Sequence, residues 1–128
     1  MADIDIPDKA RQFFIDGVES IAEWEAVLVL RRSPEDSLDA AALARQLYVK
    51  PEETAAILER LVTRGIVHRS DTVPPVFRYG PASPELDEVI GICAELYRKY
   101  LIPVTRIIHS ERKTRLRAFA DAFRLRRD

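Results

Sequence analysis

The sequence predicts a mainly α-helical protein with one two-stranded β-hairpin, and three observations carry this prediction. Several segments begin with residues that cap helices and continue with apolar residues at spacings of three and four. Two short runs after Gly65 are instead rich in β-branched and aromatic residues. From Ser83 onward the helical spacing returns and predicts long C-terminal helices.

The composition is that of an ordinary globular protein. The 128 residues are 47% hydrophobic and 32% charged, which supplies a core and disfavours intrinsic disorder. Cys93 is the only cysteine, so we expect no internal disulfide and a reducing, cytoplasmic location. The longest apolar run, residues 26–30, is far shorter than the ~20 residues that span a membrane. We therefore expect no membrane partner.

Charge is distributed unevenly along the chain. Residues 1–97 contain 10 Lys+Arg and 18 Asp+Glu, a net charge of −8. Residues 98–128 contain 10 Lys+Arg and three acids, a net charge of +7. The basic segment has three candidate partners, namely nucleic acid, an acidic protein and the acidic part of its own chain. The sequence leaves these alternatives open.

The first 32 residues predict two helices. A short helix opens at Ile6-Pro7-Asp8 and is interrupted at Gly17. Ser20 and Glu23 then have the spacing of a capping box, in which each side chain bonds the backbone N–H near the other residue. The second helix ends near residue 32, and Trp24 on its apolar side is expected to anchor the core.

The next two helices form a helix-turn-helix pair. We expect Ser37 to cap the first of them, which ends at Leu47. Pro51 stands where a helix tolerates proline, at its first position, and two acidic residues follow it. Gly65 ends this helix as the residue after the C-cap.

A hairpin is predicted directly after Gly65. Residues 66–69 and 76–79 have strand composition, and a loop with two prolines, residues 70–75, separates them. Gly80-Pro81 ends the second strand.

A long helix is predicted over about 85–109, with a kink or division by Pro103 near Leu101. A last helix is expected over about 114–125. Seven apolar or aromatic residues of the long helix alternate at spacings of four and three, and we call them the seam: Leu86, Ile90, Cys93, Tyr97, Tyr100, Val104 and Ile107. This apolar face is wider than a small domain covers, so the seam predicts a homodimer interface.

The order of helix, helix, turn, helix and hairpin is that of a winged helix-turn-helix. From Ser37 to Leu47, through Tyr48-Val49-Lys50-Pro51, and from Glu53 to Val67, the sequence resembles bacterial winged-helix transcriptional regulators of the MarR and ArsR kind. The resemblance covers about residues 20–80. It divides the chain into an N-terminal helix (1–19), a winged domain (20–80) and a C-terminal helical dimerisation arm (83–128).

The resemblance implies a DNA-binding transcriptional regulator that acts as a homodimer on double-stranded DNA. The helix over residues 51–64 would then lie in the major groove. The contacts that this implies come from that helix, its N-cap and the hairpin: Lys50, Glu53, Ala56, Arg60, Thr63, Arg64, Arg69 and Arg78. Some regulators of this kind bind effectors between the winged domain and the dimer helices, and four aromatic residues are candidates to line such a space: Phe13, Phe14, Tyr97 and Tyr100.

The charge of the expected DNA-reading surface keeps a second function open. Residues 51–64 contain three acids and two arginines, and the hairpin tip at 71–75 has no Lys or Arg. Neutralising phosphates supplies most non-specific affinity for DNA, so this surface lacks a major source of binding energy. The alternative is a winged helix that binds another protein without direct DNA contact.

No pattern in the sequence predicts an enzyme, a metal site or a cofactor. The two histidines, His68 and His109, have no cysteine or carboxylate cluster at metal-ligand spacing around them. Cys93 lies on the seam, where a small buried side chain is expected rather than a nucleophile. The chain has only four glycines and no phosphate-binding loop.

Overall fold

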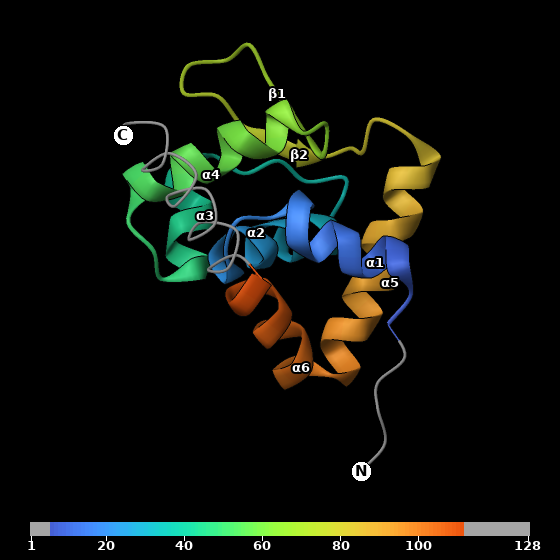
Figure 1. The fold of residues 1–128 in the computed structure, drawn as a ribbon. Helices are drawn as coiled ribbons and strands as arrows, with labels where there is room; N and C mark the ends of the chain where they lie inside the picture. The colour runs from blue at the N-terminus through green and yellow to red at the C-terminus, as the bar shows by residue number, and fades with distance from the viewer. Residues whose placement is uncertain (1–5, 112–128) are drawn as a thin grey trace, which may run out of the picture.

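The computed structural model describes residues 6–111, and within that range the helices and the hairpin follow the predicted order (Figure 1). The single π-helical turns η1 (Phe13–Gly17) and η2 (Ile107–Glu111) continue α1 and α6. The other elements are α1 (Asp8–Gln12), α2 (Ile21–Arg32), α3 (Ala40–Leu47), α4 (Pro51–Thr63), β1 (Val67–Arg69), β2 (Phe77–Tyr79), α5 (Pro84–Lys99) and α6 (Leu101–Arg106).

Local side-chain caps explain where α2 and α5 start. Ser20 Oγ accepts from the Glu23 N–H at 3.1 Å, and Ser83 Oγ accepts from the Leu86 N–H at 3.1 Å. The second hydrogen bond of the Ser20–Glu23 capping box differs from its prediction. The Glu23 carboxylate accepts from the N–H of Glu19, one residue before the cap.

The predicted cap of α3 is wrong. Asp39 caps this helix, and its Oδ1 accepts from the Ala42 N–H at 2.7 Å. Ser37 lies outside because its neighbour Leu38 pairs with Phe77 of β2 through two backbone hydrogen bonds, of 2.9 and 2.8 Å. This bridge fastens the hairpin to the segment that leads into α3.

The hairpin has the predicted position, with strands one residue shorter at their starts. Val67 faces Tyr79, His68 faces Arg78 and Arg69 faces Phe77 in antiparallel register. Residues alternate across the sheet, so the side chains of β2 point inward at both ends while its central residue is exposed.

The predicted long helix is two helices, as the position of Pro103 suggested. The backbone leaves helical geometry at Tyr100 (φ −131°, ψ 57°), and α6 then folds back toward the centre of the molecule (Figure 1). Pro103 is the third residue of α6, a first-turn position where its missing N–H costs nothing. The expected helix over 114–125 and most of the basic segment lie outside the described residues.

Trp24 is the centre of the core, as predicted, and its side chain is fully buried. The rings of Phe13, Phe14 and Tyr97 meet it edge-on, with centroids 6.0, 5.5 and 6.1 Å away. These contacts join α2 to η1 and α5, so the N-terminal and C-terminal helices share one core with the helix-turn-helix. No helix within the described residues is long and apolar enough to cross a membrane.

Tyr48, the C-cap of α3, adopts left-handed backbone geometry at φ +57° with a side chain that is 95% exposed. Glycine accepts this geometry without the Cβ clash, and little packing would be lost. We expect Tyr48→Gly to raise the free energy of unfolding by about 1 kcal/mol in chemical denaturation. Tyr48→Ala, which keeps the Cβ, is the matched control and gives no such gain. An equal effect of both variants would contradict the explanation.

Candidate nucleic-acid interface

The exposed side of α4 and the hairpin lie on one side of the molecule, away from the turn between α5 and α6 (Figure 1). Six of the eight residues expected to contact DNA are exposed there: Lys50, Glu53, Ala56, Thr63, Arg69 and Arg78. We call this surface the α4 face. It follows from the burial of the opposite side of α4, which packs Ile57, Leu58 and Leu61 into the core.

The other two expected contacts, Arg60 and Arg64, are engaged by a carboxylate inside the protein. Glu23 of α2 is fully buried. Its Oε1 accepts from Arg60 Nε at 2.8 Å, and its Oε2 accepts from Arg64 Nη1 at 2.5 Å. The arginine side chains are 40% and 27% exposed.

Arg64 also binds the segment that precedes α2. Its Nη1 donates to the Gly17 carbonyl at 2.7 Å, and its Nη2 donates to Glu19 Oε2 at 3.1 Å. We call these five residues, Gly17, Glu19, Glu23, Arg60 and Arg64, the Glu23 cluster. It links the end of α4 to the start of α2 across more than 40 residues of sequence.

Within the α4 face, the exposed side of helix α4 is acidic. Glu52, Glu53 and Glu59 are exposed on it. Glu59 also pairs with Arg69 of β1 at 3.3 Å, between two half-exposed side chains. Surface pairs of this kind contribute little to stability, but the carboxylate lowers the positive charge that Arg69 offers to a phosphate.

Two cations of the α4 face have no carboxylate partner within residues 6–111. They are Lys50, the N-cap of α4, and Arg78, the central residue of β2. Both were expected at the interface, and both point into solvent.

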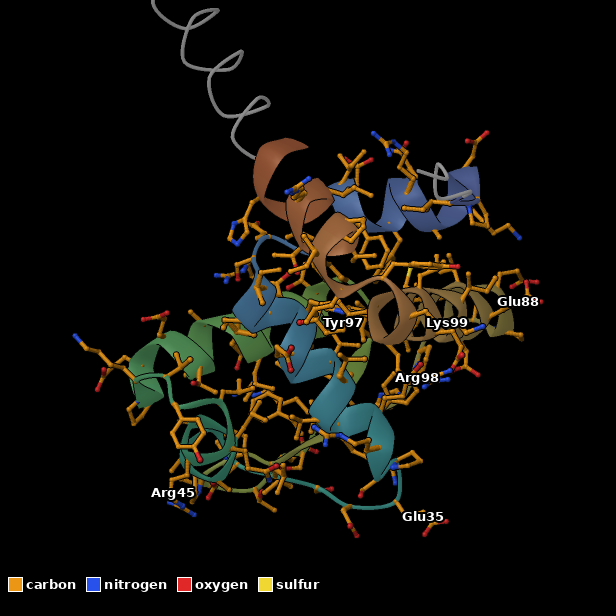
Figure 2. All side chains as sticks on the ribbon, turned by 90° about the horizontal axis from the view of Figure 1, so that it is seen from below. Glu35, Arg45, Glu88, Tyr97, Arg98 and Lys99 are labelled. Carbon is orange, nitrogen blue, oxygen red and sulfur yellow. The ribbon has the colours of Figure 1, made fainter. Side chains whose placement is uncertain are left out.

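The seam lies in a different environment from the one expected. Ile90, Cys93 and Val104 are fully buried within one chain. Tyr97 points to the centre of the molecule, where it donates to Glu25 of α2 at 2.5 Å, while Lys99 on the other side of α5 points away (Figure 2). Burial and this hydrogen bond raise the pKa of the Tyr97 phenol, which is therefore neutral at ordinary pH.

The expectation that the seam is too wide for one chain to cover is thus corrected. Helix α1 and the turn η1 pack against α5, and the turn at Tyr100 brings α6 back over the same core. Leu86 and Ile107 are partly buried against that core. The large apolar residues that α5, α6 and the turn between them leave exposed are at that turn, where Tyr100, Leu101 and Ile102 are 39%, 49% and 59% exposed. We call these three the apolar corner.

A pocket of about 610 Å³ lies beside the Glu23 cluster, between η1, the end of α4 and the start of α5. Of the four aromatic residues expected to line an effector site, only Phe13 lines this pocket. Phe14 is buried in the core. The other apolar residues that line the pocket are aliphatic, and Arg64 also lines it.

Metal-ligating side chains do not gather in the part of the chain that the structure describes, where no three His, Cys, Asp or Glu are placed to hold an ion. His68 is exposed on β1, and His109 is exposed on η2.

Helices α2, α3 and α4 with the hairpin constitute a winged helix-turn-helix fold. No family model and no curated protein matches the sequence. Solved structures match the fold: a MarR repressor from Listeria monocytogenes (16% identity, 94% of this chain and 82% of that chain, TM-score 0.52) and Sco5413, a MarR family transcriptional regulator from Streptomyces coelicolor (17%, 91% and 86%, 0.53). A third is a MepR mutant from S. aureus bound to an oligodeoxyribonucleotide (10%, 94% and 88%, 0.55).

These likenesses extend over most of each chain, beyond the region of about 20–80 on which the resemblance was based. The fold is therefore the one that the resemblance implied, with helices before and after the winged domain.

The burial of Cys93 gives a chemical test of how α5 is packed. Burial raises the pKa of the Cys93 thiol to about 12, so the reactive thiolate is scarce at pH 8. We expect no alkylation of the native chain by iodoacetamide at pH 8, and complete alkylation in denaturant, followed by mass spectrometry. Rapid alkylation of the native chain would place Cys93 on an accessible surface instead.

Proposed function

We propose that this protein is a winged-helix DNA-binding transcriptional regulator that acts as a homodimer and has no enzymatic role. The observation that carries the proposal is the α4 face, which presents the exposed side of α4 and the hairpin together. A helix presented in this way fits the major groove, while the hairpin reaches the neighbouring backbone. Such a regulator acts where a bacterial chromosome lies, so we place it in the cytoplasm.

The comparisons support this proposal at the level of fold. Several similar structures are of transcriptional regulators, and one is bound to an oligodeoxyribonucleotide. DNA binding by this chain then depends on its own α4 face. There Lys50 and Arg78 are available to phosphates, and Glu53 is placed to accept from a cytosine amino group.

The small number of available cations makes a quantitative prediction. Each neutralised phosphate contributes about −0.9 to the slope of log K against log salt, so two or three contacts give a contribution of about −2 to −3 from each α4 face. In fluorescence polarisation with a random duplex, Lys50→Ala and Arg78→Ala each flatten the slope by roughly 1. Lys99→Ala is the control, because Lys99 lies on α5 across the molecule from α4 (Figure 2).

A protein-binding module is the second candidate function, and the acidic exposed side of helix α4 favours it. Glu52, Glu53 and Glu59 repel phosphates and attract a basic partner surface. The same titration separates the two functions. No detectable duplex binding by the folded chain at ~20 mM salt, where counterion release favours binding most, would exclude DNA and leave the protein partner.

The homodimer that we propose uses the apolar corner. These three neighbouring residues expose an apolar surface at the end of the molecule opposite the α4 face (Figure 1). Pairing of two corners about a two-fold axis would cover this surface and leave both α4 faces free for DNA.

Sedimentation equilibrium tests this dimer. We expect the wild-type chain to have twice the mass of the 14.6 kDa protomer. Ile102→Glu should yield the protomer, because the new carboxylate would be desolvated in the interface without a partner. Val73→Glu is the control, since Val73 is 96% exposed at the hairpin tip. A wild-type monomer at tens of micromolar, or an unchanged dimer of Ile102→Glu, would show this interface to be wrong.

A further inference from the structure

The geometry of the Glu23 cluster fixes the orientation of α4. Arg60 and Arg64 are four residues apart on α4, so their side chains leave the same side of the helix about one turn, ~5.4 Å, apart. Each donates to a different oxygen of one carboxylate. Two bonds from successive turns to one fixed group oppose both rotation of α4 about its axis and sliding along it.

The fixed group is itself held firmly. Glu23 lies in the first turn of α2, and its Oε2 also accepts from the Glu19 N–H at 3.1 Å. A carboxylate that is removed from water needs such donors, because burial without them costs several kcal/mol. Any rotation of α4 that breaks an arginine bond therefore leaves a buried charge with too few donors.

The arginine N–H groups that hold α4 are not available to a phosphate. Arg60 uses Nε on Glu23, and Arg64 uses Nη1 and Nη2 on Glu23, Gly17 and Glu19. Ala56 and Glu53 of the α4 face are four and seven residues before Arg60, so they leave the same side of the helix and turn with it. The Glu23 cluster thus controls the orientation in which that face is presented.

We propose that Glu23 is a positioning residue for DNA binding, and that Arg60 and Arg64 hold α4 in its binding orientation rather than contact phosphates. This inference rests on the proposed function. Arg60 and Arg64 were expected to contact DNA, and here they orient α4 instead. Glu23 contributes to DNA binding without contacting DNA itself.

The dependence of affinity on salt separates positioning from contact, because only a phosphate contact contributes to the slope. The experiment uses the full chain and duplex polarisation at several salt concentrations. Glu23→Gln keeps the shape of the side chain and removes its charge. We expect about tenfold weaker binding with an unchanged slope. Lys50→Ala, a contact variant on the same helix, weakens binding and flattens the slope.

Arg64→Lys covers the case in which Glu23→Gln does not fold. A lysine still serves a phosphate, but it cannot donate to Glu23, Gly17 and Glu19 together as a guanidinium does. We expect this variant also to bind about tenfold more weakly with an unchanged slope. Circular dichroism at the assay temperature checks that every variant is folded.

Three results would overturn the inference, and they differ from failure of the proposed function. Wild-type affinity for folded Glu23→Gln would make the cluster purely structural. Wild-type affinity for Arg64→Lys, or a slope flattened by roughly 1 in Arg60→Gln, would make the arginines phosphate contacts. A wild-type chain that binds no duplex overturns the function itself, and the positioning role with it.

Discussion

The burial of one carboxylate constrains how this fold is assembled. Apolar packing around Trp24 is non-directional and would tolerate several orientations of α4. Glu23 removes that freedom, because hydrogen bonds to a buried charge weaken steeply when their angles change. The segment before α2, the start of α2 and the last turn of α4 must therefore meet at one point. The apolar core favours burial of α4, and the cluster selects its orientation.

Local interactions were the part of the fold that the sequence could predict. Ser20 and Ser83 cap their helices through bonds that span three residues, and Pro51 begins α4 where proline fits. Ser37 failed as a cap for a non-local reason. Leu38 is drawn into pairing with β2, 39 residues later, which moves the start of α3 to Asp39. A capping pattern shows where a helix can begin, and tertiary pairing decides among the candidates.

The seam and the two arginines of the Glu23 cluster illustrate a second limit of prediction from sequence. Spacings of four and three identify one apolar side of a helix, but they do not say what covers it. Ile90 and Cys93 are covered by the chain's own helices rather than by a second copy. Likewise, the sequence places Arg60 on the side of α4 expected to face DNA, but it does not show that Arg60 binds the Glu23 carboxylate, 37 residues away. A signal was present, since Glu23 stands four residues before Val27 on the buried side of α2.

With two arginines occupied by Glu23, the α4 face of the proposed regulator has little positive charge with which to bind DNA of arbitrary sequence. Non-specific affinity depends on phosphate contacts, so it is low here, and it falls only gently as salt rises. Glu53 repels the phosphates of any DNA sequence, and this repulsion is offset only where a base donates a hydrogen bond to its carboxylate. We therefore expect each α4 face to bind DNA weakly but selectively. In the proposed dimer, affinity would come from joining two such faces, because the second contact is intramolecular and needs no additional charge.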